Sequence, residues 1–163
     1  MLLEGNADPL IATDSGITAY TIARDSRRLV VAATILEACV IRGMINDDVE
    51  TVMKGVKEGA YVNIRTTGGW NPLIFASAGG HTEAVKDLLA LGSDINHVEN
   101  EDWSPLHFAA LNGFTEIVTA LLEGGIDITA VTGDGRTARA MAEEGGFKEI
   151  VELLDAHAAK AEL

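Results

Sequence analysis

The sequence has a single cysteine, Cys39, and few positive charges, with 12 Lys and Arg against 25 Asp and Glu and a formal net charge of −13. One cysteine excludes an internal disulfide and is typical of a protein from a reducing compartment. No apolar run is long enough to span a bilayer, and no charged-then-apolar leader opens the chain. We therefore expect an intracellular protein, in the cytoplasm or nucleus, with no membrane contact.

The scarcity of basic residues is greatest in the second part of the chain. Residues 1–65 carry 7 Lys and Arg against 9 Asp and Glu, whereas residues 66–163 carry 5 against 16. Such an acidic surface repels phosphate backbones, which argues against a nucleic-acid partner. It would attract a protein with a basic surface and speed the encounter. A charge that serves only solubility explains the composition equally well.

One pattern is repeated along residues 66–135. The first copy runs GWNPLIFA from Gly69 and GHTEAV from Gly80, and the second runs DWSPLHFA from Asp102 and GFTEIV from Gly113. A weaker third copy begins at Gly135, and each copy starts 33 residues after the one before. Self-similarity at this period indicates a solenoid of stacked supersecondary units.

The segment SPLHFA, at residues 104–109, resembles the signature of ankyrin repeats. The resemblance is strong over residues 66–160, partial over 36–63 and faint before that. It implies an all-α ankyrin-repeat solenoid, made of stacked helix–turn–helix units joined by hairpin loops. It also implies that His107 holds a hairpin by hydrogen bonds, and that the chain binds other proteins rather than catalysing a reaction.

Local signals place the helix ends in the two clear copies. Asn71 and Ser104 each precede a proline, so we expect them at N-cap positions with the proline at the first helical position. We expect Thr82 and Thr115 to cap the second helices. The glycines two residues before these threonines suit the left-handed conformation that ends a first helix.

The whole chain, 1–163, is predicted to form a single ankyrin-repeat domain. Its divisions are a divergent N-terminal part (1–45), a partial repeat (46–65), two repeats (66–98 and 99–131) and a C-terminal capping repeat (132–163). The last division has lost the proline and histidine of the signature, and its charged side chains suit the polar outer face that an exposed end needs.

The register of the repeats breaks before residue 46. From Thr18 to Asn71 is 53 positions, where two repeats would need 66. We therefore predict one continuous helix from about Arg28 to Met44, with Thr18 capping a short helix before it. Residues 2–8 match the tail of a repeat, so we expect the chain to begin within a unit, as a piece of a longer array or with a degenerate cap.

The partial repeat carries Gly55 where the next repeat has Leu88. A glycine inside a helix costs about 1 kcal/mol relative to alanine. We therefore expect this unit to be less stable than the two that follow.

The sequence shows no catalytic constellation. Its histidines lack the close spacing of a zinc pair, and Cys39, within an apolar run, is interpreted as a buried and inert thiol. His97 near Glu99 and Glu101 is a weak metal candidate. The glycine pairs are not followed by the Lys-Ser/Thr of a phosphate loop. We predict no enzymatic activity, no cofactor and no metal site.

The resemblance implies that partners bind at the hairpin tips and the inner face of the first helices. The positions that match are Thr67, Trp70, Ala78, Asn100, Glu101, Trp103, Leu111, Asn112, Asp134, Arg136 and Glu144. The two tryptophans are either exposed interface anchors or packing elements between hairpins. Leu111 is a better single indication, because a polar residue is expected at its position.

We therefore predict a monomeric, non-catalytic module that binds a basic partner protein through an acidic concave face and hairpin tips. One alternative is an inhibitor or immunity-type protein that blocks an enzyme with the same surface. Another is a structural subunit of a larger assembly, which should co-sediment with a large complex and be unstable alone. A regulatory binder should instead be a soluble monomer whose affinity falls with added salt.

Overall fold

The computed structural model describes residues 19–25 and 29–161. The chain divides into two compact units, Met1–Ile64 and Arg65–Leu163, and each is described by itself. The predicted cap Thr18 and the repeat tail expected at residues 2–8 lie outside the described residues. No helix in the described part of the chain is long and apolar enough to cross a membrane.

The first unit contains α1 (Ala19–Asp25), α2 (Leu29–Ile45) and α3 (Val49–Lys57). The helix α2 is continuous over 17 residues, so no loop interrupts residues 37–40. The continuous helix that the broken register predicted is therefore present, with Arg28 outside the described residues. Asp48 caps α3, because its carboxylate accepts a hydrogen bond from the Thr51 N–H at 3.0 Å.

Two glycines allow α2 and α3 to approach closely. A Cβ atom on Gly55 would lie 2.6 Å from Val40 Cγ2, and one on Gly43 would lie 2.9 Å from Val52 Cγ2. Each helix therefore presents a glycine to a buried valine of the other. The expectation that Gly55 only weakens its helix took no account of this contact.

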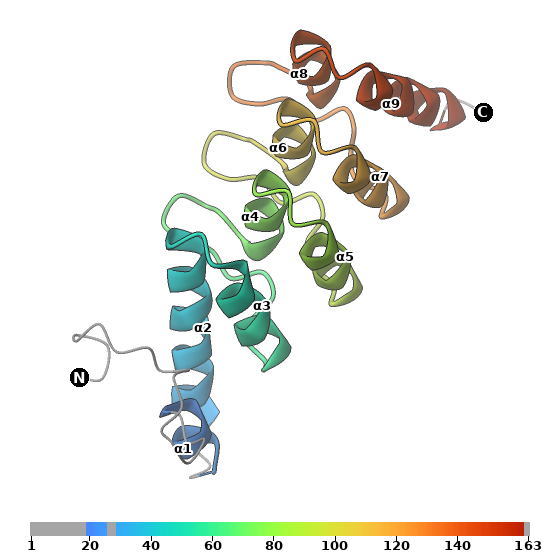
Figure 1. Cartoon of the computed structure of the whole chain (residues 1–163). Helices are drawn as coiled ribbons and strands as arrows, with labels where there is room; N and C mark the ends of the chain where they lie inside the picture. Colours follow the sequence, from blue (N-terminus) through green and yellow to red (C-terminus); the bar gives the residue numbers. More distant parts are fainter. Residues whose placement is uncertain (1–18, 26–28, 162–163) are drawn as a thin grey trace. The chain divides into compact units, whose positions relative to one another are not determined.

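Over its described residues, 65–161, the second unit consists of three helix pairs in sequence. They are α4 (Pro72–Ala78) with α5 (Thr82–Ala90), α6 (Pro105–Leu111) with α7 (Thr115–Glu123), and α8 (Ala138–Glu144) with α9 (Lys148–Ala161). In Figure 1 the first helices α4, α6 and α8 form one row, and the second helices α5, α7 and α9 form another. The loops before α6 and α8 project from the first row, away from the second.

The predicted N-caps of the first helices are confirmed. Asn71 Oδ1 accepts a hydrogen bond from the Ile74 N–H at 2.8 Å, and Ser104 Oγ accepts one from the His107 N–H at 3.4 Å. Thr137 does the same for Ala140 in the third pair. The glycines expected to end the first helices are left-handed, with φ between 74° and 75° at residues 80, 113 and 146.

The caps predicted for the second helices are wrong. Thr82 and Thr115 are already the first helical residues of α5 and α7, and the residues before them make no side-chain capping hydrogen bond. The cause is a tight turn: the Thr82 N–H donates to Gly80 O at 3.0 Å, and the Thr115 N–H donates to Gly113 O at 3.1 Å. These backbone contacts replace a side-chain cap.

The core of the second unit lies between the two rows of helices. Val85 and Leu88 of α5, and Val118 and Leu121 of α7, are fully buried. At the end of the unit Asp155 replaces an apolar residue and receives two hydrogen bonds from Arg139, at 2.6 and 3.1 Å. This ion pair lowers the pKa of the Asp155 carboxyl. Such charged pairs build the polar face expected of a capping unit.

Candidate functional site

Three hairpin tips with the same hydrogen bonding lie before α4, α6 and α8. In the middle hairpin the Glu99 N–H donates to Trp103 O, and the Asp102 N–H donates to Glu99 O, both at 3.1 Å. The hairpins at residues 66–70 and 132–136 have the equivalent pairs, with distances between 2.7 and 3.0 Å. The tips therefore present equivalent positions of each repeat in the same orientation.

Hydrogen bonds between neighbouring tips align them. The Asn100 N–H donates to Gly68 O at 3.2 Å, and its side chain donates to Thr67 O at 3.1 Å. One repeat later the Gly133 N–H donates to Glu101 O at 2.9 Å. The acceptors of these hydrogen bonds are backbone carbonyls, so the alignment of the tips does not involve the Glu101 carboxylate.

Aromatic rings connect the bases of these hairpins. Phe108 of α6 lies between the two tryptophans, with ring centroids 4.9 Å from Trp70 and 5.1 Å from Trp103. The Arg136 guanidinium continues the row, 5.6 Å from the Trp103 ring centroid. The tryptophans are half-buried in this row, so they pack between hairpins and still show part of each ring to solvent.

The second and third tips enclose a shallow hollow of about 470 Å³. Its lining comprises Asn100, Glu101, Asp102, Trp103, Gly133, Asp134 and Arg136. Three carboxylates therefore face one guanidinium, and the hollow is acidic. Arg136 pairs with Asp134 at 2.8 Å and with Glu144 at 3.6 Å.

Asp134 is held in its charged form. The Thr132 hydroxyl donates a hydrogen bond to its carboxylate, and Arg136 lies beside it. Both contacts, the hydroxyl first, lower the pKa of Asp134 below its usual value. The acidic character of the hollow therefore persists at neutral and mildly acidic pH.

The structure gathers most of the predicted site residues into one surface. We define the hairpin strip as Thr67, Trp70, Asn100, Glu101, Trp103, Asp134 and Arg136, to which Glu144 is joined through Arg136. Ala78, Leu111 and Asn112 lie apart from it, at the C-terminal ends of α4 and α6. There the Asn112 side chain donates to Ala78 O at 3.4 Å, and Leu111 is 39% exposed.

Sequence reasoning missed Phe108 and Asp102. Asp102 has φ 63°, a left-handed conformation, whereas the equivalent positions of the adjacent hairpins are Gly69 and Gly135 with φ 83° and 82°. The 33-residue register contains this signal, because it aligns Asp102 with a glycine on either side. An L-residue in this region costs free energy that glycine avoids.

Replacing Asp102 by glycine is expected to stabilise the protein by about 0.5–1 kcal/mol, because glycine adopts the left-handed conformation without strain. Glycine also raises the conformational entropy of the unfolded chain, which offsets part of this gain. Urea unfolding followed by circular dichroism measures the change. The matched control is Gly135→Asp, where an added Cβ meets no atom within 4 Å. A loss of stability in Gly135→Asp would therefore report the cost of the left-handed backbone alone. Equal stability of wild type and both variants would contradict the explanation.

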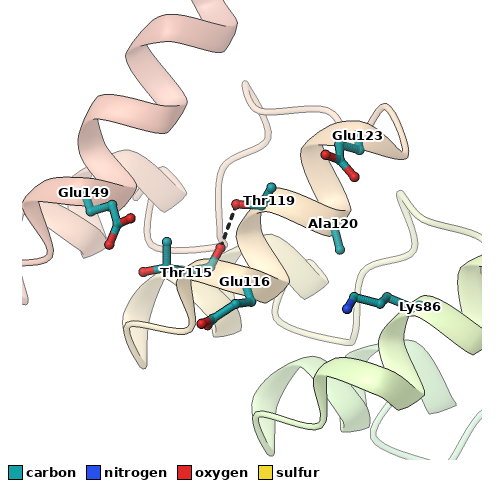
Figure 2. A pocket seen from close by; sticks show the side chains of 7 residues that line it. All are labelled: Lys86, Thr115, Glu116, Thr119, Ala120, Glu123 and Glu149. Carbon is teal, nitrogen blue, oxygen red and sulfur yellow. Dashed lines mark hydrogen bonds between the residues drawn. The ribbon is translucent and has the colours of Figure 1, made fainter.

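A second hollow, of about 430 Å³, lies on the row of second helices. Figure 2 shows Thr115, Thr119 and Ala120 of α7 with Glu116, Glu123 and Glu149 around them and Lys86 reaching from α5. Lys86 is paired with Glu83 at 2.9 Å, and that contact raises the pKa of Lys86. Sequence reasoning did not consider this face, although Glu83, Glu116 and Glu149 share the 33-residue spacing.

The described residues contain no group of three or more His, Cys, Asp or Glu side chains that could hold a metal ion. His97 Nε2 lies 2.7 Å from Gly69 O, so this ring links its own hairpin to the preceding one. His107 Nε2 contacts Ala130 O at 3.1 Å, which confirms the hairpin contact that the resemblance implied.

Repeated helix pairs with aligned hairpins define a class, that of stacked helical repeat proteins. The family model of ankyrin repeats matches residues 36–132 in three copies, which is more than half of the chain. The chain therefore belongs to the ankyrin-repeat family, and the all-α repeat fold predicted from the sequence is confirmed. A search of curated proteins found no match.

Ankyrin repeats are generally protein–protein interaction modules, and the family is generally non-catalytic. The matched segment covers the hairpins at 66–70 and 99–103 and ends at Thr132, where the third hairpin begins. The hairpin strip therefore extends past the matched repeats into the C-terminal unit.

Proposed function

We propose that this chain is a non-catalytic module that binds another protein through the hairpin strip. The observation that carries the proposal is the continuity of the strip: three aligned hairpins present one aromatic row and one acidic hollow. Backbone hydrogen bonds fix the hairpins relative to one another before a partner arrives, so little backbone conformational entropy is lost on binding. Half-buried tryptophans are frequent anchors of such interfaces.

The partner that fits this surface has a basic face. Glu101, Asp102 and Asp134 outnumber the single guanidinium of the hollow, and residues 66–163 carry 16 Asp and Glu against 5 Lys and Arg. Complementary charge speeds association and makes it sensitive to ionic strength. We propose further that the module acts as a monomer inside the cell, in the cytoplasm or nucleus, which is in keeping with its single, fully buried cysteine.

The test is capture of partner proteins from cell lysate with wild type and with Glu101→Lys as bait, followed by affinity measurement with the purified partner. Glu101 is exposed, and only its backbone joins the hairpin contacts, so the variant should fold normally. We expect affinity to fall about tenfold or more, as for a charge reversal at an interface. The identity of the partner then separates a regulator from an enzyme inhibitor or an assembly subunit.

The matched control is Glu116→Lys, which makes the same charge change on the row of second helices (Figure 2). We expect it to retain affinity within about twofold, because Glu116 lines the hollow on the second helices and no part of the hairpin strip, and salt screens charges that are far apart. Equal loss with both variants would show that only net charge matters. Unchanged capture by Glu101→Lys would remove the hairpin strip as the binding surface.

A further inference from the structure

The face of Trp103 already carries one cation, which belongs to the chain itself. The Arg136 guanidinium carbon lies 5.6 Å from the Trp103 ring centroid, within the range of a cation–π contact. Arg136 is the one cation in the lining of the hollow, and its side chain is 35% exposed to solvent. A guanidinium therefore fits against this ring in the unbound protein.

The hollow holds more negative charge than Arg136 balances. Arg136 is paired with Asp134, which leaves Glu101 and Asp102 as the other two carboxylates in the lining that Trp103 shares. Asp102 Oδ2 lies beside Gly133, 3.9 Å from where a Cβ of that glycine would be. Gly133 therefore borders this carboxylate without a side chain of its own.

We propose that the hollow binds an arginine side chain of the partner, stacked on Trp103 and paired with Glu101 and Asp102, and that Arg136 is the internal competitor for the ring. This inference rests on the proposed function and names the chemistry of its partner. Arginine fits better than lysine, because its planar guanidinium stacks on aromatic rings and bonds carboxylates through two N–H groups. When it is displaced, Arg136 remains between Asp134 and Glu144, with which it already pairs.

The experiment uses the full chain and the blocked pentapeptide acetyl-Gly-Gly-Arg-Gly-Gly-amide, with citrulline and lysine peptides of the same length. Trp70 and Trp103 are the two tryptophans of the sequence, so their indole N–H signals in a nitrogen-15 NMR spectrum report on the site and on an internal reference. We expect the arginine peptide to shift the Trp103 signal and to bind at least about fivefold more tightly than the citrulline peptide.

The variant Arg136→Ala should bind the arginine peptide about threefold or more tightly than wild type, because the ring is no longer occupied. It should also favour arginine over lysine more strongly. The control Arg139→Ala removes the same charge from a residue that pairs with Asp155 and Glu143, and should change affinity by less than about twofold. Trp103→Leu should abolish the preference for arginine over citrulline.

Two results overturn the inference: equal binding of the arginine and citrulline peptides, or weaker binding by Arg136→Ala. Its failure is separable from that of the proposed function. If Glu101→Lys loses the captured protein while no peptide binds at Trp103, the module is a binder of another chemistry. If the arginine peptide binds but capture is unaffected by Glu101→Lys, the hollow takes arginine and the strip is not the surface for the captured protein.

Discussion

Replacing Gly55 by alanine is expected to destabilise the first unit by about 1–2 kcal/mol, although helix propensity alone predicts a gain of about 1 kcal/mol. The reason is the contact between α2 and α3, where the new Cβ would lie 2.6 Å from Val40 Cγ2. Val40 is fully buried, and its branched side chain has few alternative rotamers. The helices must therefore separate or the valine must leave its rotamer.

A double-mutant cycle distinguishes this clash from a general effect of the substitution. Val40→Ala removes the methyl group that the new Cβ would meet, so Gly55→Ala should be much less harmful in that background, with a favourable coupling of about 1 kcal/mol or more. Urea unfolding followed by circular dichroism, with hydrogen exchange of the α2 and α3 amides, measures the change in the unit that contains it. Both tryptophans lie in the second unit, so their fluorescence is not the right probe.

Gly43 differs from Gly55, because an added Cβ there would clash with backbone atoms as well as with a side chain. Its Cβ would meet Val52 Cγ2 at 2.9 Å but also Asp48 O and Val52 N at 3.1 Å. Because backbone atoms cannot be trimmed, Val52→Ala should rescue Gly43→Ala only in part. If alanine at position 55 instead stabilises the protein by the full propensity term, the two helices do not pack as closely as the structure shows.

The periodic part of the sequence predicted most of the second unit. A 33-residue repeat fixes where each proline, N-cap and left-handed glycine falls, because each of these residues satisfies a local backbone requirement. The resemblance to ankyrin repeats, applied in the same register, assigned Asn100, Glu101 and Trp103 to one surface before any contact was known. The caps at Thr82 and Thr115 failed because a backbone turn satisfies what a side chain was expected to satisfy.

Contacts that do not follow the repeat were not predictable. The pairing of Gly55 with Val40 depends on the register between α2 and α3, where the repeat pattern is broken. Phe108 occupies an ordinary signature position, and only the structure shows that its ring contacts both Trp70 and Trp103. Asp102 was predictable from the sequence, unlike these contacts. Its alignment with Gly69 and Gly135 in the 33-residue register indicates a left-handed backbone at this position.

His107 joins the fold to the candidate site. It is 1% exposed, and its Nδ1 accepts a hydrogen bond from the Ser104 N–H at 3.1 Å. The proton of the neutral ring is therefore assigned to Nε2, which donates to Ala130 O at 3.1 Å. This ring fastens the start of α6 to the chain that leads into the third hairpin, and so it supports both walls of the acidic hollow.

Replacing His107 by alanine is expected to cost about 2–4 kcal/mol, from a cavity and from the unpaired Ser104 N–H and Ala130 O. His107→Ile is the matched variant, because the preceding repeat has Ile74 at the equivalent position. Isoleucine restores most of the side-chain volume but makes neither hydrogen bond. The loss of stability in this variant, about 1–3 kcal/mol, therefore measures the contribution of the hydrogen bonds. An isoleucine variant as stable as wild type would show that the ring acts through volume alone.

The pH dependence of stability gives the His107 prediction a second, independent readout. Burial, as the largest cause, lowers the pKa of His107 in the folded protein below its usual value. Below about pH 6.5 the unfolded chain then binds more protons than the folded one, so wild-type stability falls as pH decreases through this range. The His107→Ile variant should lack this slope between pH 7.5 and about 5, where the lowered pKa of Asp134 keeps that carboxylate charged. Urea midpoints at the two pH values measure the difference, and parallel losses in wild type and variant would assign the slope to other groups.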